Sequence, residues 1–357
     1  MSANDAVAGP FHLLRPQDLP RIHPVLDGAG ASTGAAAVVD SVLRGVNPGT
    51  LDTVEAALRE NGLTAADFTV LTDDPSESVS NRANDQAFGI VRVSGDRLGV
   101  LRHSTLRGYQ ILLRELFSSG TDLSATKLDW LHLAFVRLLA LHAGTDDAVD
   151  AKIAVEPHAS GPCPPPADST HALRRWTSGH HVFMVLVQGL IIALQEMAEN
   201  IRIGRIAGAQ RSFDLASALM RGSNAALTFT GDFPYSEYEK RVRPTLIPPT
   251  APPDMSGLRW RDHEYLIRVL VRLRPIFAEL DPRLEPWREE FLQALTGSYD
   301  AHKTVCAHFV GNDQSSVLMS NRTTQSAVST LDKFKRSRSA LVRTRRKPDR
   351  ADPGERG

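Results

Sequence analysis

Apolar residues recur at spacings of three and four over most of the chain after about residue 105, which is the period of an amphipathic α-helix. Two clear stretches run from Leu106 to Phe117 and from Ala125 to His142, and Ser124 is a suitable N-cap for the second. Residues 180–194 are apolar on every side, which predicts a helix buried at the centre of the fold. The pattern predicts a mainly α-helical protein.

Strand-like alternation is confined to the N-terminal part of the chain. It runs from Phe88 to Leu101 around the polar turn Ser94-Gly-Asp96, and this predicts a small β-hairpin. We therefore expect three regions: an N-terminal accessory region over residues 1–104, a helical domain over residues 105–330, and a tail over residues 331–357.

Two segments interrupt the helical pattern. Residues 229–254 contain six prolines and form a long irregular crossover; a loop of this length inside a compact domain is often functional. After residue 320 the apolar periodicity fades, and the chain carries the basic run Arg343-Thr-Arg-Arg-Lys347 near its end. We therefore expect the tail to be disordered.

The charge balance argues against one broad class of partner. The chain carries 41 basic and 41 acidic residues, so it has no net charge to attract nucleic acid or an acidic membrane surface. The N-terminus lacks the pattern of a signal peptide, and the apolar run from Val182 to Leu194 is too short to span a bilayer. The two cysteines, Cys163 and Cys306, do not make a disulfide framework. We expect a cytoplasmic protein without a nucleic-acid or membrane partner.

Candidate chemistry is concentrated near the end of a predicted helix that leads up to Gly311. His302 and Cys306 are four positions apart, so both side chains lie on one face of that helix. An imidazole and a thiol in this arrangement can hold one haem twice, because the imidazole can coordinate the iron while the thiol forms a thioether with a vinyl group. The residues alone leave open a buried structural cysteine and a zinc site completed by His263.

Three separated segments resemble the tryptophan 2,3-dioxygenase superfamily of helical haem proteins. The segment from His181 to Gln188 is similar to the family pattern H-x-F-x-V-x-H-Q, although Val187 stands where the family has its distal histidine. The segment Ser256-Gly-Leu-Arg-Trp-Arg-Asp-His263 is similar to the family's S-G-F-Q-S stretch. His302, followed nine residues later by Gly311, matches the proximal histidine and its glycine.

The departures from this pattern fall on positions that the dioxygenases use for tryptophan. Cys306 replaces a valine, Glu264 falls near the position of the arginine that binds the substrate carboxylate, and residues 312–316 replace a Gly-Thr-Gly-Gly run. A His-x3-Cys segment together with a second histidine in the S-G segment is similar to the 3-methyl-L-tyrosine hydroxylase family of saframycin-type antibiotic pathways. This resemblance implies a tryptophan 2,3-dioxygenase-like helical haem-binding fold.

The resemblance also implies a cofactor and a reaction. The cofactor would be a c-type haem with a single thioether to Cys306, and its iron would be bound by His302 on the proximal side and by His263 on the distal side in the resting state. His263 would leave the iron and act in acid–base catalysis. The enzyme would hydroxylate 3-methyl-L-tyrosine ortho to the phenol to give 3-hydroxy-5-methyl-L-tyrosine, using hydrogen peroxide or dioxygen with a reductant.

Several alternatives remain open. The chain could be a ring-cleaving dioxygenase of the tryptophan 2,3-dioxygenase type, a bis-histidine c-type haem protein for electron transfer, or a regulatory protein whose basic tail binds nucleic acid. The oligomeric state is open, and a homodimer is one expectation. Side chains that could line the pocket are Trp176, His180 and His181. Arginines that could pair with haem propionates or a substrate carboxylate are Arg259, Arg261, Arg268, Arg272 and Arg274.

Overall fold

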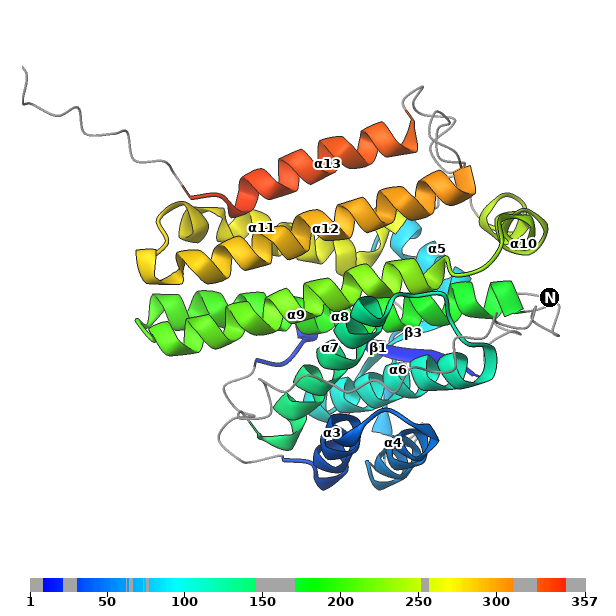
Figure 1. The fold of residues 1–357 in the computed structure, drawn as a ribbon, viewed down its shortest axis with the longest axis horizontal. Helices are drawn as coiled ribbons and strands as arrows, with labels where there is room; N and C mark the ends of the chain where they lie inside the picture. The colour runs from blue at the N-terminus through cyan, green and yellow to red at the C-terminus, as the bar shows by residue number, and fades with distance from the viewer. Residues whose placement is uncertain are drawn as a thin grey trace, which may run out of the picture.

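The computed structural model shows a mainly α-helical protein with one small sheet, as the apolar periodicity predicts (Figure 1). The structure describes residues 9–21, 31–61, 63, 67–72, 74, 77–145, 171–251, 257–310 and 326–344. The described helices are α3 (Thr33–Arg44), α4 (Pro48–Glu60), α5 (Val79–Ala87), α6 (Arg97–Ser119), α7 (Ala125–Ala143), α8 (His171–Arg202), α9 (Ile206–Thr230), α10 (Tyr235–Glu237), α11 (Arg261–Ala278), α12 (Glu285–Val310) and α13 (Ala327–Val342).

Helix α8 lies at the centre of the fold, between α9, α11 and α6 (Figure 1). Helix α12 packs along α9, and α13 packs on α12 and α11. By length and composition alone α8 could cross a membrane, but 83% of its most apolar window is buried inside the protein. Its apolar surface on all sides is therefore used for packing against neighbouring helices, as the sequence predicts.

Close approach of the central helices depends on a small residue in α9. A Cβ atom added at Gly222 would lie 2.4 Å from the Cβ atom of Ala134 in α7. A separation this short is not compatible with two side chains, so the contact between α7 and α9 requires glycine at this position.

The sheet has three short strands in the order β1-β3-β2. Strand β1 (Phe11–Leu14) pairs in parallel with β3 (Ile90–Ser94), and β2 (Thr69–Val70) pairs antiparallel with β3. The predicted hairpin from Phe88 to Leu101 is therefore wrong in its second half. Asp96 accepts hydrogen bonds from the backbone N–H groups of the residues two and three positions on, so the polar turn serves as the N-cap of α6 rather than as a hairpin turn.

The predicted region boundaries do not coincide with breaks in the structure. Helix α6 runs through residue 104, and α13 runs through residue 331. The expectation of disorder from residue 331 is wrong up to Val342, because Ser326 caps α13 and the apolar side chains of this helix pack against α11 and α12. Residues 345–357, with most of the basic run, lie outside the described residues.

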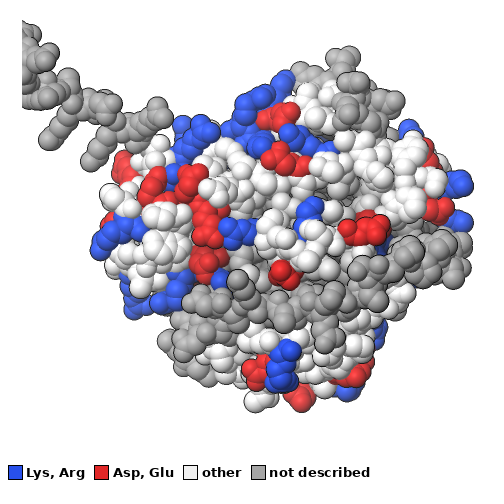
Figure 2. Space-filling model, in the orientation of Figure 1, with Lys and Arg blue, Asp and Glu red and all other residues white. Residues whose placement is uncertain are grey.

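Acidic and basic side chains are interspersed on the face of the molecule shown in Figure 2. Ion pairs of this mixed kind join α12 to α13, where Lys303 Nζ lies 2.8 Å from Asp332 and Lys335 Nζ lies 2.6 Å from Asp300. This distribution agrees with the neutral composition of the chain.

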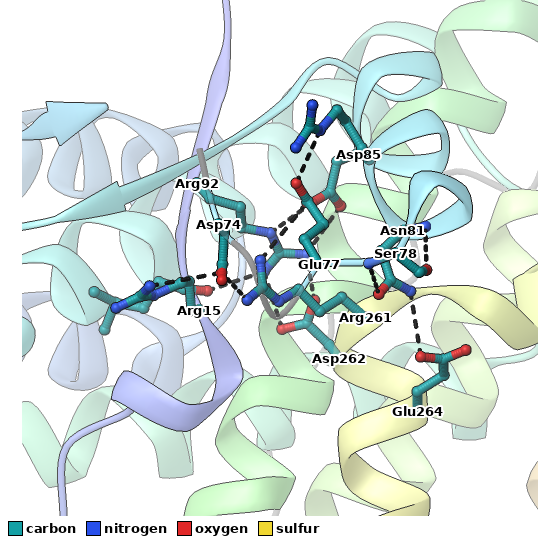
Figure 3. A network of polar contacts seen from close by, with 12 residues as sticks. Arg15, Asp74, Glu77, Ser78, Asn81, Asp85, Arg92, Arg261, Asp262 and Glu264 are labelled. Carbon is teal, nitrogen blue, oxygen red and sulfur yellow. Dashed lines mark hydrogen bonds and ion pairs between the residues drawn. The ribbon is translucent and has the colours of Figure 1, made fainter. Parts of the chain in front are cut away.

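A buried polar network joins the sheet to the start of α11 (Figure 3). Arg92 on β3 donates to Asp85 at 2.7 and 2.9 Å and to Asp262 at 2.5 and 3.2 Å. Its guanidinium also donates to the carbonyl of Leu14 at 2.9 Å. Gln188 on α8 donates to the same carbonyl and to Asp262, both at 2.8 Å. The network therefore holds four segments that are distant in sequence at one buried point.

The charges in this network depend on one another. Arg92 is 5% exposed, and Asp262 is fully buried. Burial disfavours the Arg92 cation, but Asp262 and Asp85 outweigh that effect and raise the pKa of Arg92. Removal of the guanidinium would leave two carboxylates close together in a water-poor interior, which is far more costly than the loss of an exposed ion pair.

We predict that Arg92→Met lowers the free energy of unfolding by about 3–5 kcal/mol, because it leaves uncompensated buried carboxylates. The matched control is Arg82→Met, since Arg82 pairs with Glu77 at 3.1 Å and its side chain is 49% exposed. The control should cost less than about 1 kcal/mol. Urea unfolding followed by circular dichroism measures both variants, and equal losses would contradict the role assigned to Arg92.

Candidate functional site

One pocket lies between α8, α9, α11 and α12. It holds about 870 Å³ of space not filled by atoms, open solvent at its mouth included. Its walls are mostly apolar, with Phe183, Val187 and Leu190 from α8 and Leu266 and Leu270 from α11. A concave, largely apolar pocket with a few polar groups is the usual form of a cofactor or substrate site.

The pocket brings together two of the predicted site residues, His263 on α11 and His302 on α12. Helical spacing places both there. On α12, Leu295, Ser298 and His302 form one stripe that faces the pocket. On α11, His263 begins an equivalent stripe that continues through Leu266 and Leu270. Residues about 40 positions apart in sequence therefore contribute imidazoles to the same space.

The environment of His302 favours its neutral form. Burial, with a smaller contribution from the nearby His263, lowers the pKa of His302 to about 4. At neutral pH the imidazole therefore carries no charge and keeps one nitrogen lone pair, which is the form that binds a metal.

The polar network fixes the helix turn that carries His263. The two residues before it, Arg261 and Asp262, are both buried and both tied to the N-terminal part of the chain (Figure 3). Arg261 pairs with Asp74, and Asp262 pairs with Arg92. Trp260 holds the N-cap position without a side-chain cap, so these ion pairs position the first turn of α11 together with a hydrogen bond from Asn81 Nδ2 to Glu264 Oε2 at 3.3 Å.

The sequence left open whether His180 lines the pocket. It lines the pocket, and its Nδ1 donates to the carbonyl of Trp176 at 2.6 Å. Burial lowers the pKa of His180 to about 3, so the second nitrogen keeps its lone pair. The ring packs between Trp176 and Trp260 at centroid distances of 4.6 and 5.0 Å.

The neighbouring His181 lies outside the pocket. Its Nε2 is 2.6 Å from the carbonyl oxygen of Phe88, and its ring stacks on Phe11 at a centroid distance of 4.4 Å. It is a structural histidine that joins α8 to the N-terminal sheet. Val187, at the position of the distal histidine in the dioxygenases, does line the pocket.

Cys306 lies one turn beyond His302 on α12 and is half-buried, but it does not line the pocket in this structure. Burial raises the pKa of the Cys306 thiol to about 11, so the thiol is protonated at neutral pH. Ser256 and residues 311–316, which carry part of the resemblance, lie outside the described residues, and so does Cys163.

The five candidate arginines are all described, and none of them lines the pocket. Arg261 is engaged with Asp74, and Arg259 donates to Ser80 at 3.2 Å. Arg268 and Arg272 lie over the ring of Tyr265. In this structure, none of them is placed to bind a ligand in the pocket.

The zinc alternative is not supported by the described part of the chain, which contains no group of three or more His, Cys, Asp or Glu side chains arranged around a metal ion. His263 and His302 face one pocket, while Cys306 lies outside it. The arrangement suits two imidazole ligands on a flat cofactor better than the tetrahedral site of zinc.

The sequence profile of the family described as SfmD 3-methyl-L-tyrosine peroxygenase matches residues 12–286. The chain belongs to this family. A relative from Streptomyces lavendulae, named 3-methyl-L-tyrosine peroxygenase, is 39% identical over 335 residues, covering 92% of this chain and 89% of the relative.

The same family appears among solved structures. The crystal structure of reduced SfmD, obtained by soaking with sodium hydrosulfite, is 36% identical with a TM-score of 0.68, and the match covers 85% of this chain and 100% of that one.

Membership of this peroxygenase family identifies the chain as an oxidoreductase. The expectation drawn from the His-x3-Cys and S-G segments is confirmed at the level of the family, and so is the mainly helical fold. The family profile ends at residue 286, before His302 and Cys306. The roles of these two residues and of His263, and the wider likeness to the tryptophan 2,3-dioxygenase superfamily, stay predictions.

Proposed function

We propose that the chain is a haem-dependent peroxygenase that hydroxylates 3-methyl-L-tyrosine ortho to its phenol, giving 3-hydroxy-5-methyl-L-tyrosine with hydrogen peroxide as oxidant. The observation that carries the proposal is the pair His263 and His302, which line one apolar pocket in a member of the peroxygenase family. The substrate is that named for the Streptomyces lavendulae relative. Cytoplasmic location, a homodimer and the lack of membrane or nucleic-acid partners remain predictions from the sequence.

The pocket residues fit a haem. The walls are apolar, and two imidazoles reach the space from separate helices. His302 would be the proximal iron ligand and His263 the distal one in the resting state, and Cys306, one turn from His302, would form the thioether. A haem bound there would supply the oxidising chemistry with peroxide that amino-acid side chains cannot supply themselves.

The side chains of the pocket have separate tasks in this proposal. His302, uncharged at neutral pH, keeps its lone pair for the cofactor. His263, once released, can take a proton from one peroxide oxygen and return it to the other. Ser223 and Ser298 line the pocket, and their hydroxyl groups can orient a phenol by hydrogen bonding. The apolar walls limit competing water.

The anchored first turn of α11 limits how His263 could leave the iron. Arg261 and Asp262 are held by buried ion pairs, so a movement of the whole helix turn would break them. If His263 held the iron of a bound haem, its release would therefore occur by rotation of its side chain, since its backbone is anchored from the N-terminal side.

We predict that His263→Ala keeps the haem but changes its absorption spectrum from low-spin toward high-spin. Two imidazole ligands give a strong ligand field, and loss of one leaves a position open to water. His302→Ala should instead lose most of the haem. His181→Ala is the matched control, because that imidazole lies on α8 outside the pocket; a spectrum unchanged in His263→Ala would remove this residue from the iron.

We predict that Cys306→Ala allows the haem to be extracted by acid and acetone, whereas the wild-type pigment stays with the polypeptide. The thiol lies one turn from His302 on the same helix, so a thioether and an iron ligand can be held together. Mass spectrometry of the denatured chain measures the attached haem. Complete extraction from the wild-type protein would show that the thioether does not form.

The decisive experiment gives the purified haem protein hydrogen peroxide and 3-methyl-L-tyrosine. Mass spectrometry should detect a product heavier by one oxygen atom with its ring intact, because the proposed reaction replaces one ring hydrogen by hydroxyl. Dioxygen with a reductant is the comparison that identifies the oxidant. Cleavage of tryptophan to N-formylkynurenine, with no product from tyrosine analogues, would restore the ring-cleaving dioxygenase. Normal haem content without turnover of either substrate would favour electron transfer.

A further inference from the structure

A chain of aromatic rings leads from the pocket to the protein surface. Trp260 and His180 line the pocket, and Trp176 packs against His180 at a centroid distance of 4.6 Å. Tyr238 follows, with its ring edge-on to Trp176 at 6.0 Å. Tyr235, one turn before Tyr238, is 49% exposed. From Trp260 through His180 and Trp176 to Tyr238, each ring is close enough to the next for an electron to pass between them.

Tyr238 belongs to the irregular crossover between α9 and α11, which the sequence marked as a segment of unusual length. It begins the π-helical turn η4 (Tyr238–Val242), a type of turn that is frequent at functional sites. Its ring stacks on Phe309 of α12 at 4.4 Å and 17°. Burial raises the pKa of Tyr238 to about 12, with a smaller contribution from nearby Cys306. The phenol is therefore protonated at rest and lies close to the proposed attachment point of the haem.

The indoles of Trp176 and Trp260 differ from the phenol of Tyr238 in how readily each loses a proton after it has lost an electron. The indole nitrogens of Trp176 and Trp260 are buried without a hydrogen-bond partner. An indole that loses an electron there has no acceptor for its N–H proton, so it stays a strong oxidant and draws an electron from its neighbour. Tyr238 is also buried, but a phenol that loses an electron gives up its O–H proton far more readily than an indole gives up its N–H proton.

We infer that Trp176 and Tyr238 carry oxidising equivalents out of the pocket when no aromatic substrate is bound. This inference rests on the proposed function, because the oxidant is the one formed from hydrogen peroxide at the site. Tyr238 passes one electron through Trp176 to this oxidant in the pocket. Its O–H bond breaks, the proton goes to solvent, and a neutral tyrosyl radical remains. A one-electron donor in solution, such as ascorbate, restores the phenol with an electron and a proton. Two such cycles reduce one hydrogen peroxide to two waters.

The pocket contains a side chain that this path would protect. Met220 lines the pocket, and its sulfur lies 3.4 Å from the hydroxyl oxygen of Ser298. A thioether beside a peroxide-derived oxidant is converted to the polar sulfoxide, which disturbs apolar packing. An electron drawn from Tyr238 consumes the oxidant before it reaches Met220. The same path gives the protein a second activity, the peroxide-dependent oxidation of small reductants.

Tyr299 is the rival source of electrons, because it lines the pocket directly. Tyr265 on α11 does not line the pocket and lies under two arginine side chains instead. Single Tyr→Phe changes at these two positions and at Tyr238 keep each aromatic ring and remove only the phenol hydroxyl. They therefore separate redox participation from packing.

The test mixes the haem-loaded protein with hydrogen peroxide in the absence of aromatic amino acid, freezes it within milliseconds to seconds, and records the electron paramagnetic resonance spectrum. The wild-type protein should give a tyrosyl radical. Tyr238→Phe should lose that signal and Trp176→Phe should weaken it, whereas Tyr299→Phe and Tyr265→Phe should keep it. Peptide mass spectrometry should find more Met220 sulfoxide in Tyr238→Phe than in the wild type.

An undiminished radical in Tyr238→Phe, or its loss in Tyr299→Phe, would overturn the inference. Failure of the inference is distinguishable from failure of the proposed function. A wild-type protein that hydroxylates 3-methyl-L-tyrosine but forms no tyrosyl radical overturns the electron path alone. A protein that holds no haem, or that does not hydroxylate this substrate, overturns the proposed function and the path together.

Discussion

The buried pairing of Arg92 with Asp262 is the contact on which the arrangement of the site depends. It joins a strand near the N-terminus to the helix turn that carries His263. Because both charges are buried, each is tolerated only while the other is in place. The N-terminal sheet, Gln188 on α8 and the start of α11 thus become one unit. The N-terminal region, which the sequence suggests to be accessory, is therefore part of the framework of the pocket.

The pocket combines an apolar wall with imidazoles that burial keeps uncharged. Low pKa values at His180 and His302 follow chiefly from desolvation rather than from hydrogen bonding. An uncharged imidazole retains the lone pair that a metal centre requires. The same desolvation raises the pKa of the Cys306 thiol. The proposed thioether would therefore start from a protonated thiol, and it would depend on the cofactor coming within reach of α12 rather than on a reactive thiolate.

One of the aromatic rings beside the pocket, Tyr238, belongs to the irregular crossover between α9 and α11. Tyr238 stacks on Phe309 and meets Trp176, and Trp176 in turn packs against His180, which lines the pocket. In the proposed reaction, such side chains would protect the pocket when the substrate is absent, because the oxidant would otherwise attack the pocket itself.

The sequence by itself determined what depends on local spacing. Periodicity located α7 with its Ser124 cap and the buried centre of α8, and the His-x3-Cys spacing placed His302 and Cys306 on one helical face. Only the tertiary structure decided what depends on distant partners. Asp96 caps a helix instead of turning a hairpin, and α13 is helical because it packs on α11 and α12. His180 enters the pocket while His181 binds a backbone carbonyl outside it, because adjacent residues of a helix point to different neighbours, and no local pattern names those neighbours.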